Sequence, residues 1–223
     1  MNKSTQDGAK VYTPLTLKIY DWWVLGISNR FAWKCSTNDH LVPHFKKHLG
    51  QRHLDIGVGT GFYLQHVPKN IDISLMDINA DSLAVAKERV SSHCCTTTIQ
   101  HDIFEAIPAE YEGRYDSVSL YYLLHCLPGT LAEKRIALLN ASKALKPNGI
   151  LFGATILGDE GNHNLLGKKL MHVYNSRGIF SNVQDTEAGL SHELNNLFEN
   201  VVVNRIGKVV LFSASGKVEL PTT

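Results

Sequence analysis

The sequence of 223 residues predicts an α/β fold with a mainly parallel sheet covered by helices on both faces. Three observations predict it. Short β-branched and apolar runs alternate with amphipathic runs between residues 53 and 156. The first apolar run leads into three alternate glycines, Gly57, Gly59 and Gly61, as in a strand–turn–helix unit. Two later runs end at acidic residues, Asp77 and Asp102.

The N-terminal part is expected to be helical from residue 11 to residue 49, after a polar and loose first ten residues. All three tryptophans of the chain fall in it, together with Tyr12 and Tyr20. Two interpretations stay open. Such aromatic residues either pack a helical layer on the sheet or turn their faces toward a ligand as a lid.

Three strands are expected in the first half of the core, at residues 53–56, 71–76 and 96–100. The turn after the first strand continues into a short helix, residues 63–66, which Pro68 stops. A second helix is expected at residues 82–90, with Asn79 or Asp81 as its cap. This alternation of strand and helix predicts parallel strands with right-handed crossovers.

The second half continues the alternation and then breaks it. Strands are expected at residues 115–121 and 150–156, a helix at 131–145 and a turn at 146–149. Residues 158–190 are rich in glycine and asparagine, with a helical piece at 165–174. Two late strands, 201–206 and 208–214, flank Gly207, and so short a link makes them antiparallel neighbours.

The glycine turn is a place where a nucleoside-containing ligand lies against the backbone. A dinucleotide fingerprint needs its third glycine where Phe62 stands, so the turn fits that pattern poorly. Asp55, two residues before Gly57, also indicates a nucleoside ligand other than a dinucleotide. Asp77 lies about 20 residues beyond the first glycine, where a carboxylate accepts hydrogen bonds from ribose hydroxyls.

Asp102 and Ile103 follow the third predicted strand. The carboxylate is suited to accept the exocyclic amine of adenine, and the isoleucine offers an apolar surface to the ring. The alternative for Asp102 is an N-cap of a helix at residues 103–106.

Composition excludes several function classes. The formal net charge is +1 and the charges are scattered, so no nucleic-acid partner is expected. The chain has no apolar run of about 18 residues and no apolar signal segment, so no membrane partner is expected. Four cysteines without a C-x-x-C pair predict reduced thiols in a cytoplasmic protein, without metal or redox chemistry.

The motifs together resemble those of the class I S-adenosylmethionine-dependent methyltransferases of the small-molecule type. The resemblance covers about residues 50–214, and the matching segments are 54–61, 76–78, 101–103, 115–119 with Leu124-His125, and 145–151. It implies a seven-stranded Rossmann-like sheet of order 3-2-1-4-5-7-6, with strand seven antiparallel. It also implies an N-terminal helical lid (residues 1–49), a core of residues 50–223 and an insert at about 158–190 over the acceptor pocket.

The resemblance implies S-adenosylmethionine as the cofactor and methyl transfer by in-line displacement as the reaction. The residues expected to bind the cofactor are Asp55, Gly57, Gly59, Gly61, Asp77, Ile78, Asp102, Ile103, Tyr121 and, from the lid, Tyr20. Those expected around the substrate are Tyr12, Trp33, His163 and His172; the two histidines are otherwise solvated surface residues.

His125 is the best candidate for a general base because it lies just past the fourth strand, although relatives carry a histidine there without using it in catalysis. Tyr122 is a second catalytic candidate, and its hydroxyl either orients the substrate or packs.

The expected acceptor is a small apolar or aromatic metabolite, with secondary metabolism as the suggested role. Motifs for base amino groups, for protein arginine and for metal-dependent catechols do not follow strand four. Two alternatives stay open: a protein or RNA methyltransferase, and a non-catalytic partner protein that binds the same cofactor. The oligomeric state and the acceptor atom cannot be read from the sequence.

Overall fold

A computed structural model describes residues 21–90, 96–158 and 164–218 of the chain. Its seven strands form one sheet, in the order β3-β2-β1-β4-β5-β7-β6. The strands are β1 (Arg52–Ile56), β2 (Asp72–Asp77), β3 (Thr96–Gln100), β4 (Tyr115–Tyr121), β5 (Leu145–Ile156), β6 (Phe198–Ile206) and β7 (Val209–Lys217). β1 to β5 are parallel, and β7 runs antiparallel to both of its neighbours. The predicted topology is therefore confirmed.

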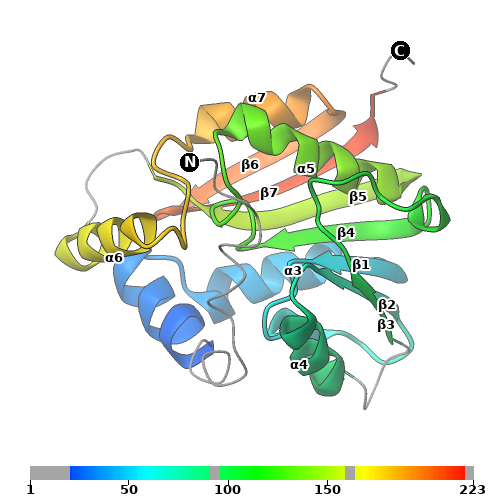
Figure 1. Cartoon of the computed structure of the whole chain (residues 1–223), viewed down its shortest axis with the longest axis horizontal. Helices are drawn as coiled ribbons and strands as arrows, with labels where there is room; N and C mark the ends of the chain where they lie inside the picture. The colour runs from blue at the N-terminus through cyan, green and yellow to red at the C-terminus, as the bar shows by residue number, and fades with distance from the viewer. Residues whose placement is uncertain (1–20, 91–95, 159–163, 219–223) are drawn as a thin grey trace.

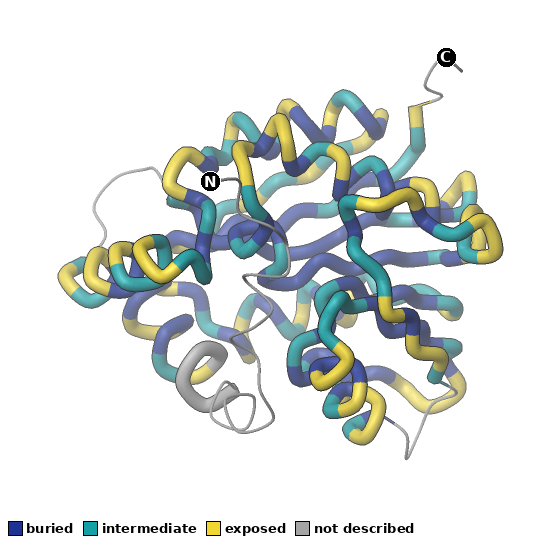
Figure 2. The backbone as a smooth tube through the Cα atoms, in the orientation of Figure 1, coloured by how far each residue is buried: buried dark blue, intermediate teal, exposed yellow. Residues whose placement is uncertain are grey.

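Helices cover both faces of this sheet (Figure 1). They are η1 (Asp21–Ala32), η2 (Thr37–Leu41), α3 (Val42–His48), η3 (Tyr63–His66), α4 (Ala80–Val90), η4 (Ala109–Tyr111), α5 (Leu131–Ala144), α6 (Leu165–Ser176) and α7 (Glu187–Asn195). Two apolar clusters fill the interior: α3, α4 and α6 contribute to one, and α5 and α7 to the other. The buried strands lie between the two layers (Figure 2). Within the described part of the chain, no helix is long and apolar enough to cross a bilayer.

Two elements differ from those predicted. The helix α7 is stabilised at its start by Thr186, whose side chain accepts a hydrogen bond from the Gly189 N–H, within the segment expected to be irregular. The expected turn at residues 146–149 lies inside β5 instead. Leu145 pairs with Tyr115 and Ile150 with Ser117, so the extra residues form an irregularity in the ladder rather than a separate turn. At the second helix, Asn79 is the residue whose side chain accepts the Asp81 N–H.

The N-terminal segment is attached to the far hairpin of the sheet. Gly207 adopts a left-handed φ of 62°, and a Cβ there would lie 2.3 Å from the carbonyl oxygen of Trp33. The N–H of Lys208 donates to that same oxygen at 2.8 Å. The Trp33 side chain is buried and packs against Phe180, with ring centroids 6.3 Å apart. The division between residues 49 and 50 stays a prediction.

A buried ion pair fixes the segment that leads into α7. Lys134 of α5 donates from Nζ to Asp185 at 2.6 Å and to the carbonyl oxygen of Ser181 at 2.8 Å. The two side chains are 0% and 2% exposed. Burying both charges is costly, and removal of one partner strands the other in a medium of low dielectric.

We therefore expect Lys134→Ala to lower the free energy of unfolding by about 3–5 kcal/mol, because Asp185 loses its buried counter-ion. Urea unfolding measures this loss. Lys143→Ala, which removes an exposed lysine from the same helix, is the matched control and is expected to stay within about 0.5 kcal/mol of the parent. Equal losses in the two variants would contradict the assignment.

Candidate functional site

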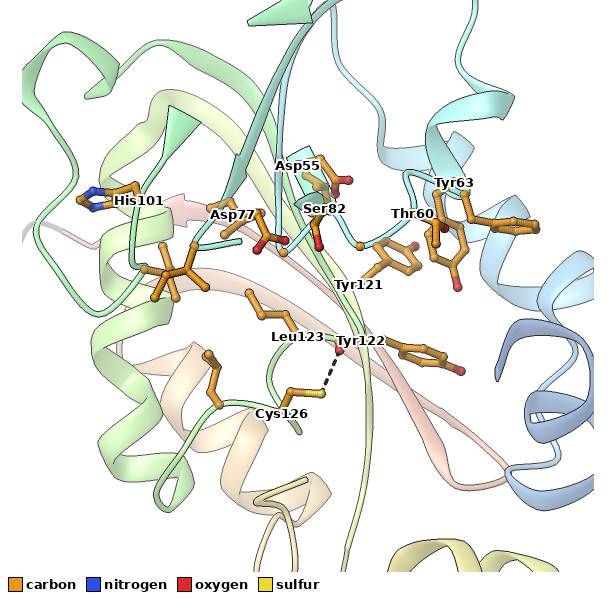
Figure 3. A pocket seen from close by; sticks show the side chains of 18 of the residues that line it. Asp55, Thr60, Tyr63, Asp77, Ser82, His101, Tyr121, Tyr122, Leu123 and Cys126 are labelled. Carbon is orange, nitrogen blue, oxygen red and sulfur yellow. Dashed lines mark hydrogen bonds between the residues drawn. The ribbon is translucent and has the colours of Figure 1, made fainter. Parts of the chain in front are cut away.

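A pocket opens at the carboxyl ends of β1, β2 and β4 (Figure 3). It brings together most of the residues predicted to bind the cofactor: Asp55, Gly57, Gly59, Asp77, Ile78, Asp102, Ile103 and Tyr121, with Tyr122 beside them. These residues come from four separate strands or their loops. They meet because parallel strands end at the same edge of the sheet.

The pocket also contains residues that the sequence did not single out: Ile56, Val58, Thr60, Phe62, Tyr63, Ser82, His101, Leu123, Cys126 and Leu127. Most of them are sequence neighbours of the motifs, and their adjacency was the available signal. Tyr63 and Ser82 are different, because they reach the pocket through the first turns of η3 and α4. Only the packing of those helices brings them in.

The three glycines of the turn have different surroundings. All adopt left-handed φ values, 74° at Gly57, 51° at Gly59 and 70° at Gly61. A Cβ on Gly57 would lie 2.8 Å from Leu123, and one on Gly61 would lie 3.0 Å from Ala86 of α4. A Cβ on Gly59 would meet nothing within 4 Å. Gly59 therefore faces the open pocket, whereas Gly61, which does not line it, allows close packing of α4.

Asp77 ends β2 and lies across from the turn. Burial raises its pKa to about 6, against the opposing effect of backbone N–H groups from Asn79, Gly59 and Val58. The Asn79 N–H donates to Oδ1 at 2.9 Å. A partly buried carboxylate fixed in this way points an acceptor into the pocket, as a ribose diol requires.

Asp55 is more deeply buried, with 6% of its surface exposed. Burial raises its pKa to about 7; the hydrogen bond from the Ser119 hydroxyl lowers it, and the nearby charge of Asp77 raises it. The bond from Ser119 Oγ to Asp55 Oδ1 crosses from β4 to β1. The pocket thus contains two carboxyl groups whose ionised form a cationic ligand group would stabilise.

Two consecutive tyrosines form a wall of the pocket, and the Tyr121 ring lies against that of Tyr63, which follows the glycine turn, with centroids 4.5 Å apart. The Tyr121 hydroxyl lies 2.6 Å from Nδ1 of His44, whose pKa is lowered to about 3 mainly by burial. The neutral imidazole pairs with the tyrosine hydroxyl in either of its tautomers, as acceptor or as donor. The Tyr122 hydroxyl donates to Oδ1 of Asn29 at 2.7 Å. Both rings are consequently held by the N-terminal elements, η1 and α3.

His125 lies behind this wall and does not line the pocket. Its Nδ1 accepts the N–H of Ile156 at 3.2 Å, and its ring meets that of Phe180 edge-on at 4.5 Å. Burial lowers its pKa to about 3, which makes the imidazole a weak base. Its role as a general base stays a prediction.

Among the described residues, the two predicted substrate residues do not line the pocket. Trp33 is buried against Phe180, and His172 is exposed on α6. Tyr12, Tyr20 and His163 lie outside the described residues. Asp102 does not cap a helix: its Oδ1 accepts the N–H of Phe104 at 3.0 Å in a local turn.

The donor set fits an adenosine-containing cofactor. Gly59 leaves open space beside the backbone, Asp77 supplies an acceptor for hydroxyls, and Ile78 and Ile103 supply apolar surface on the same side. Farther along, Asp55 supplies a carboxylate suited to a cationic group.

Comparisons with known proteins agree with this geometry. Residues 54–151 match a family described as a methyltransferase domain. The chain is 55% identical over 193 residues to YbcY of Escherichia coli (strain K12), which covers 86% of this chain and 100% of that protein. It is 38% identical to the physcion biosynthesis cluster O-methyltransferase of Aspergillus chevalieri, with 94% and 95% of the two chains covered. The solved DhpI–SAH complex is similar in fold, with a TM-score of 0.66, 14% identity, and coverage of 96% and 98%.

The first prediction from the site separates two glycines. Gly59→Ala is expected to weaken S-adenosylmethionine binding, because the added methyl group enters the open pocket, and to cost about 1–2 kcal/mol of stability through its left-handed φ. Gly61→Ala is expected to lose more stability because its Cβ also meets α4. Gly113→Ala, which has φ 62° and open space in a remote turn, is the control for backbone strain alone. Calorimetry and urea unfolding test this, and unchanged affinity in Gly59→Ala would refute it.

The second prediction concerns the stability of the ligand-free protein. The folded pKa of Asp55, about 7, lies above the value of 3.8 expected when the chain unfolds. The native state therefore binds more protons between these values, and this carboxyl costs stability as pH rises from about 4 to 7. Asp55→Asn is expected to be more stable than the parent by an amount that grows over this range to about 2–4 kcal/mol.

Urea unfolding at pH 5 and pH 8 measures that difference. Glu110→Gln, at an exposed carboxylate, is the matched control and is expected to show no such growth. An Asp55→Asn advantage that is the same at both pH values would contradict the raised pKa.

Proposed function

The chain belongs to the class I S-adenosylmethionine-dependent methyltransferases, and from this premise we propose that it methylates a hydroxyl oxygen of a small, mainly apolar or aromatic metabolite. The observation that carries the proposal is the chemical character of the pocket beyond the glycine turn. From the last residue of β4 to position 127, the described residues that line the pocket are Tyr121, Tyr122, Leu123, Cys126 and Leu127. None of these side chains carries a charge at neutral pH, so the surface suits an apolar acceptor.

Oxygen as the acceptor atom is supported by the relatives. The O-methyltransferase of Aspergillus chevalieri is 38% identical over almost the whole of both chains, and its name places it in a biosynthetic cluster. A role in secondary metabolism is proposed for this chain on the same ground.

The cofactor is proposed to lie across the ends of β3, β2 and β1. Asp102 and Ile103 would hold the adenine, Asp77 the ribose hydroxyls, and Asp55 the α-ammonium group of the methionine part. When bound, S-adenosylmethionine supplies a methyl group on a sulfonium, which a nucleophile displaces in line. The Tyr121 ring, fixed by its bond to His44, offers a π-face to a cation.

Alignment is the main contribution proposed for the chain's own residues. Holding an acceptor in line with the methyl group contributes roughly 7–11 kcal/mol. Tyr122 is proposed to position the acceptor through its ring, since its hydroxyl donates to Asn29. That bond, with the one from Asn164 Nδ2 to the Phe31 carbonyl oxygen at 2.6 Å, supports the proposal that residues 1–49 and the 158–190 insert enclose the acceptor side.

We expect Asp77→Ala to weaken S-adenosylmethionine binding by about 1–3 kcal/mol, because the ribose hydroxyls lose their acceptor. Isothermal titration calorimetry measures this. Asp72→Ala is the matched control: Asp72 starts the same strand and pairs with Arg52 at 3.0 Å, at the opposite end of the sheet. Equal affinities in Asp77→Ala and the parent would contradict the proposed ribose site.

The acceptor class is tested by methyl transfer to paired phenols and anilines of the same ring system. The proposal expects products from the phenols only. Transfer to anilines alone would overturn oxygen as the acceptor. Transfer only to protein or RNA would favour a macromolecular substrate, and tight cofactor binding without any transfer would favour a binding protein.

A further inference from the structure

A ladder of polar side chains runs through the otherwise apolar face of the sheet beneath α3. In the parallel register of β1 and β4, His53 stands opposite Ser117 and Asp55 opposite Ser119. Since side chains alternate along a strand, these four residues share one face. All are buried, at 0% exposure for His53, Ser117 and Ser119 and 6% for Asp55.

These four side chains are connected by hydrogen bonds that run from Gly50, just before β1, to Asp55 at the pocket. The Gly50 N–H donates to Ser117 Oγ at 2.8 Å, and that oxygen lies 2.8 Å from His53 Nδ1. His53 Nε2 lies 3.1 Å from Ser119 Oγ, and Ser119 donates to Asp55 Oδ1.

The charge of Asp55 fixes the direction of these hydrogen bonds. A backbone N–H only donates, and an ionised carboxylate only accepts. With Asp55 ionised, Ser119 donates to Asp55 and accepts from Nε2–H of His53, and Nδ1 accepts the hydroxyl proton of Ser117, which in turn accepts from Gly50. Protonation of Asp55 reverses the series, and His53 then carries its proton on Nδ1. The position of the proton on His53 therefore reports the charge of Asp55.

Loss of one of these hydrogen bonds would cost free energy because the side chains are buried among aromatic rings. The His53 ring packs between Phe45 and Phe152, with centroids 5.6 Å and 5.8 Å away. An unpaired polar group in such a place loses its hydration without compensation. The chain of bonds is thus the means by which β4 and β1 hold a carboxylate in one orientation at the pocket.

We propose that Ser119, His53 and Ser117 are positioning residues that hold Asp55 anionic and aimed at the α-ammonium group of the cofactor. This rests on the proposed function, in which Asp55 contacts that group. None of the three lines the pocket, so they act through Asp55.

Other titratable groups face Asp55 from the packed elements. They are Asp77 from β2, Tyr121 from β4 and His53 from its own strand, with His44 and His48 of α3 behind Tyr121 and Phe152. Burial is the main cause that lowers the pKa of all three histidines, to about 3 for His44 and His53, so these two stay neutral between pH 5 and 9. Asp77, with a pKa near 6, is the group that a pH experiment has to separate from Asp55.

Two ligands make this separation. S-adenosylhomocysteine carries both the ribose and the α-ammonium group, whereas 5′-methylthioadenosine carries the ribose alone. Calorimetric affinities of the intact protein are measured for both from pH 5 to pH 9. A loss of affinity at low pH (an acid limb) that is due to protonation of Asp77 appears with both ligands. An acid limb that is due to protonation of Asp55 appears only with S-adenosylhomocysteine.

In Ser119→Ala the carboxylate loses a donor, so the pKa of Asp55 rises and the acid limb of S-adenosylhomocysteine binding moves up by about 1 pH unit. The expected result is binding about tenfold weaker than the parent at pH 6 and nearly equal at pH 9, with unchanged 5′-methylthioadenosine binding. Ser119→Thr keeps a hydroxyl and is expected to restore the profile. Ser142→Ala removes another buried serine hydroxyl, on α5, and is the control for loss of packing.

His53→Phe keeps the ring between Phe45 and Phe152 but removes the donor to Ser119. Its limb is expected to move in the same direction by less than in Ser119→Ala, and the double variant to add nothing further, because the connection passes through Ser119. In the parent at pH 9, where Asp55 is ionised, ¹⁵N NMR of labelled histidine is expected to find His53 neutral with its proton on Nε2.

An unshifted pH dependence in a folded Ser119→Ala overturns the proposal, as does a proton on Nδ1 of His53 at pH 9. The NMR result decides the matter even where a variant does not fold. Equal losses for both ligands would assign Ser119 a purely structural role. Failure of the parent to bind either ligand would instead overturn the proposed function itself.

Discussion

Two carboxylates share one buried end of the sheet, and the rest of the site depends on the cost of keeping them there. Asp55 and Asp77 end neighbouring parallel strands, so the fold itself brings them together. Burial raises the pKa of each, and the charge of Asp77 adds to the effect on Asp55. A site of this kind is less stable when empty than when it binds a ligand with hydroxyl donors and a cationic group. Such a ligand offsets the free-energy cost of burying the two carboxylates, so the site binds it in preference to ligands without these groups.

The glycine turn leaves space for a ligand beside the two carboxylates. A side chain at Gly59 would fill the space where a ligand approaches, and one at Gly61 would push α4 away from the turn. The backbone N–H groups of Val58 and Gly59 face Asp77, so the same turn that admits the ligand also supports the carboxylate. Ligand access and electrostatic support therefore come from one short segment.

The sequence predicted parallel strands with the glycine turn and two carboxylates at one edge because those signals are local, whereas the order of all seven strands followed from the resemblance to the methyltransferase family. The three glycines, Asp77 and Asp102 each follow a strand at a recognisable spacing, and parallel strands bring such positions to one edge. The support beneath them was not predictable. Asp55 and Ser119 are 64 residues apart, and Tyr122 and Asn29 are 93 apart, so their bonds exist only once the strands and the N-terminal elements are packed. His125 follows the fourth strand, the place expected for a base, but its ring packs against Phe180, which lies in the segment expected to be irregular.

The backbone is strained where β4 ends, at the two consecutive tyrosines. Along a strand, successive side chains point to opposite faces, so Tyr121 and Tyr122 would be separated. Tyr122 instead has a φ of 58°, which is uncommon for an aromatic residue and stores strain. The reversal brings both rings into the same apolar cluster (Figure 3). Their hydroxyls then reach His44 and Asn29. Because the strain is balanced by these two bonds to α3 and η1, the shape of the acceptor wall depends on how the N-terminal elements are packed. The N-terminal elements, which lie outside the segment 54–151 that matches the methyltransferase domain, thus help to set the geometry of this wall of the pocket.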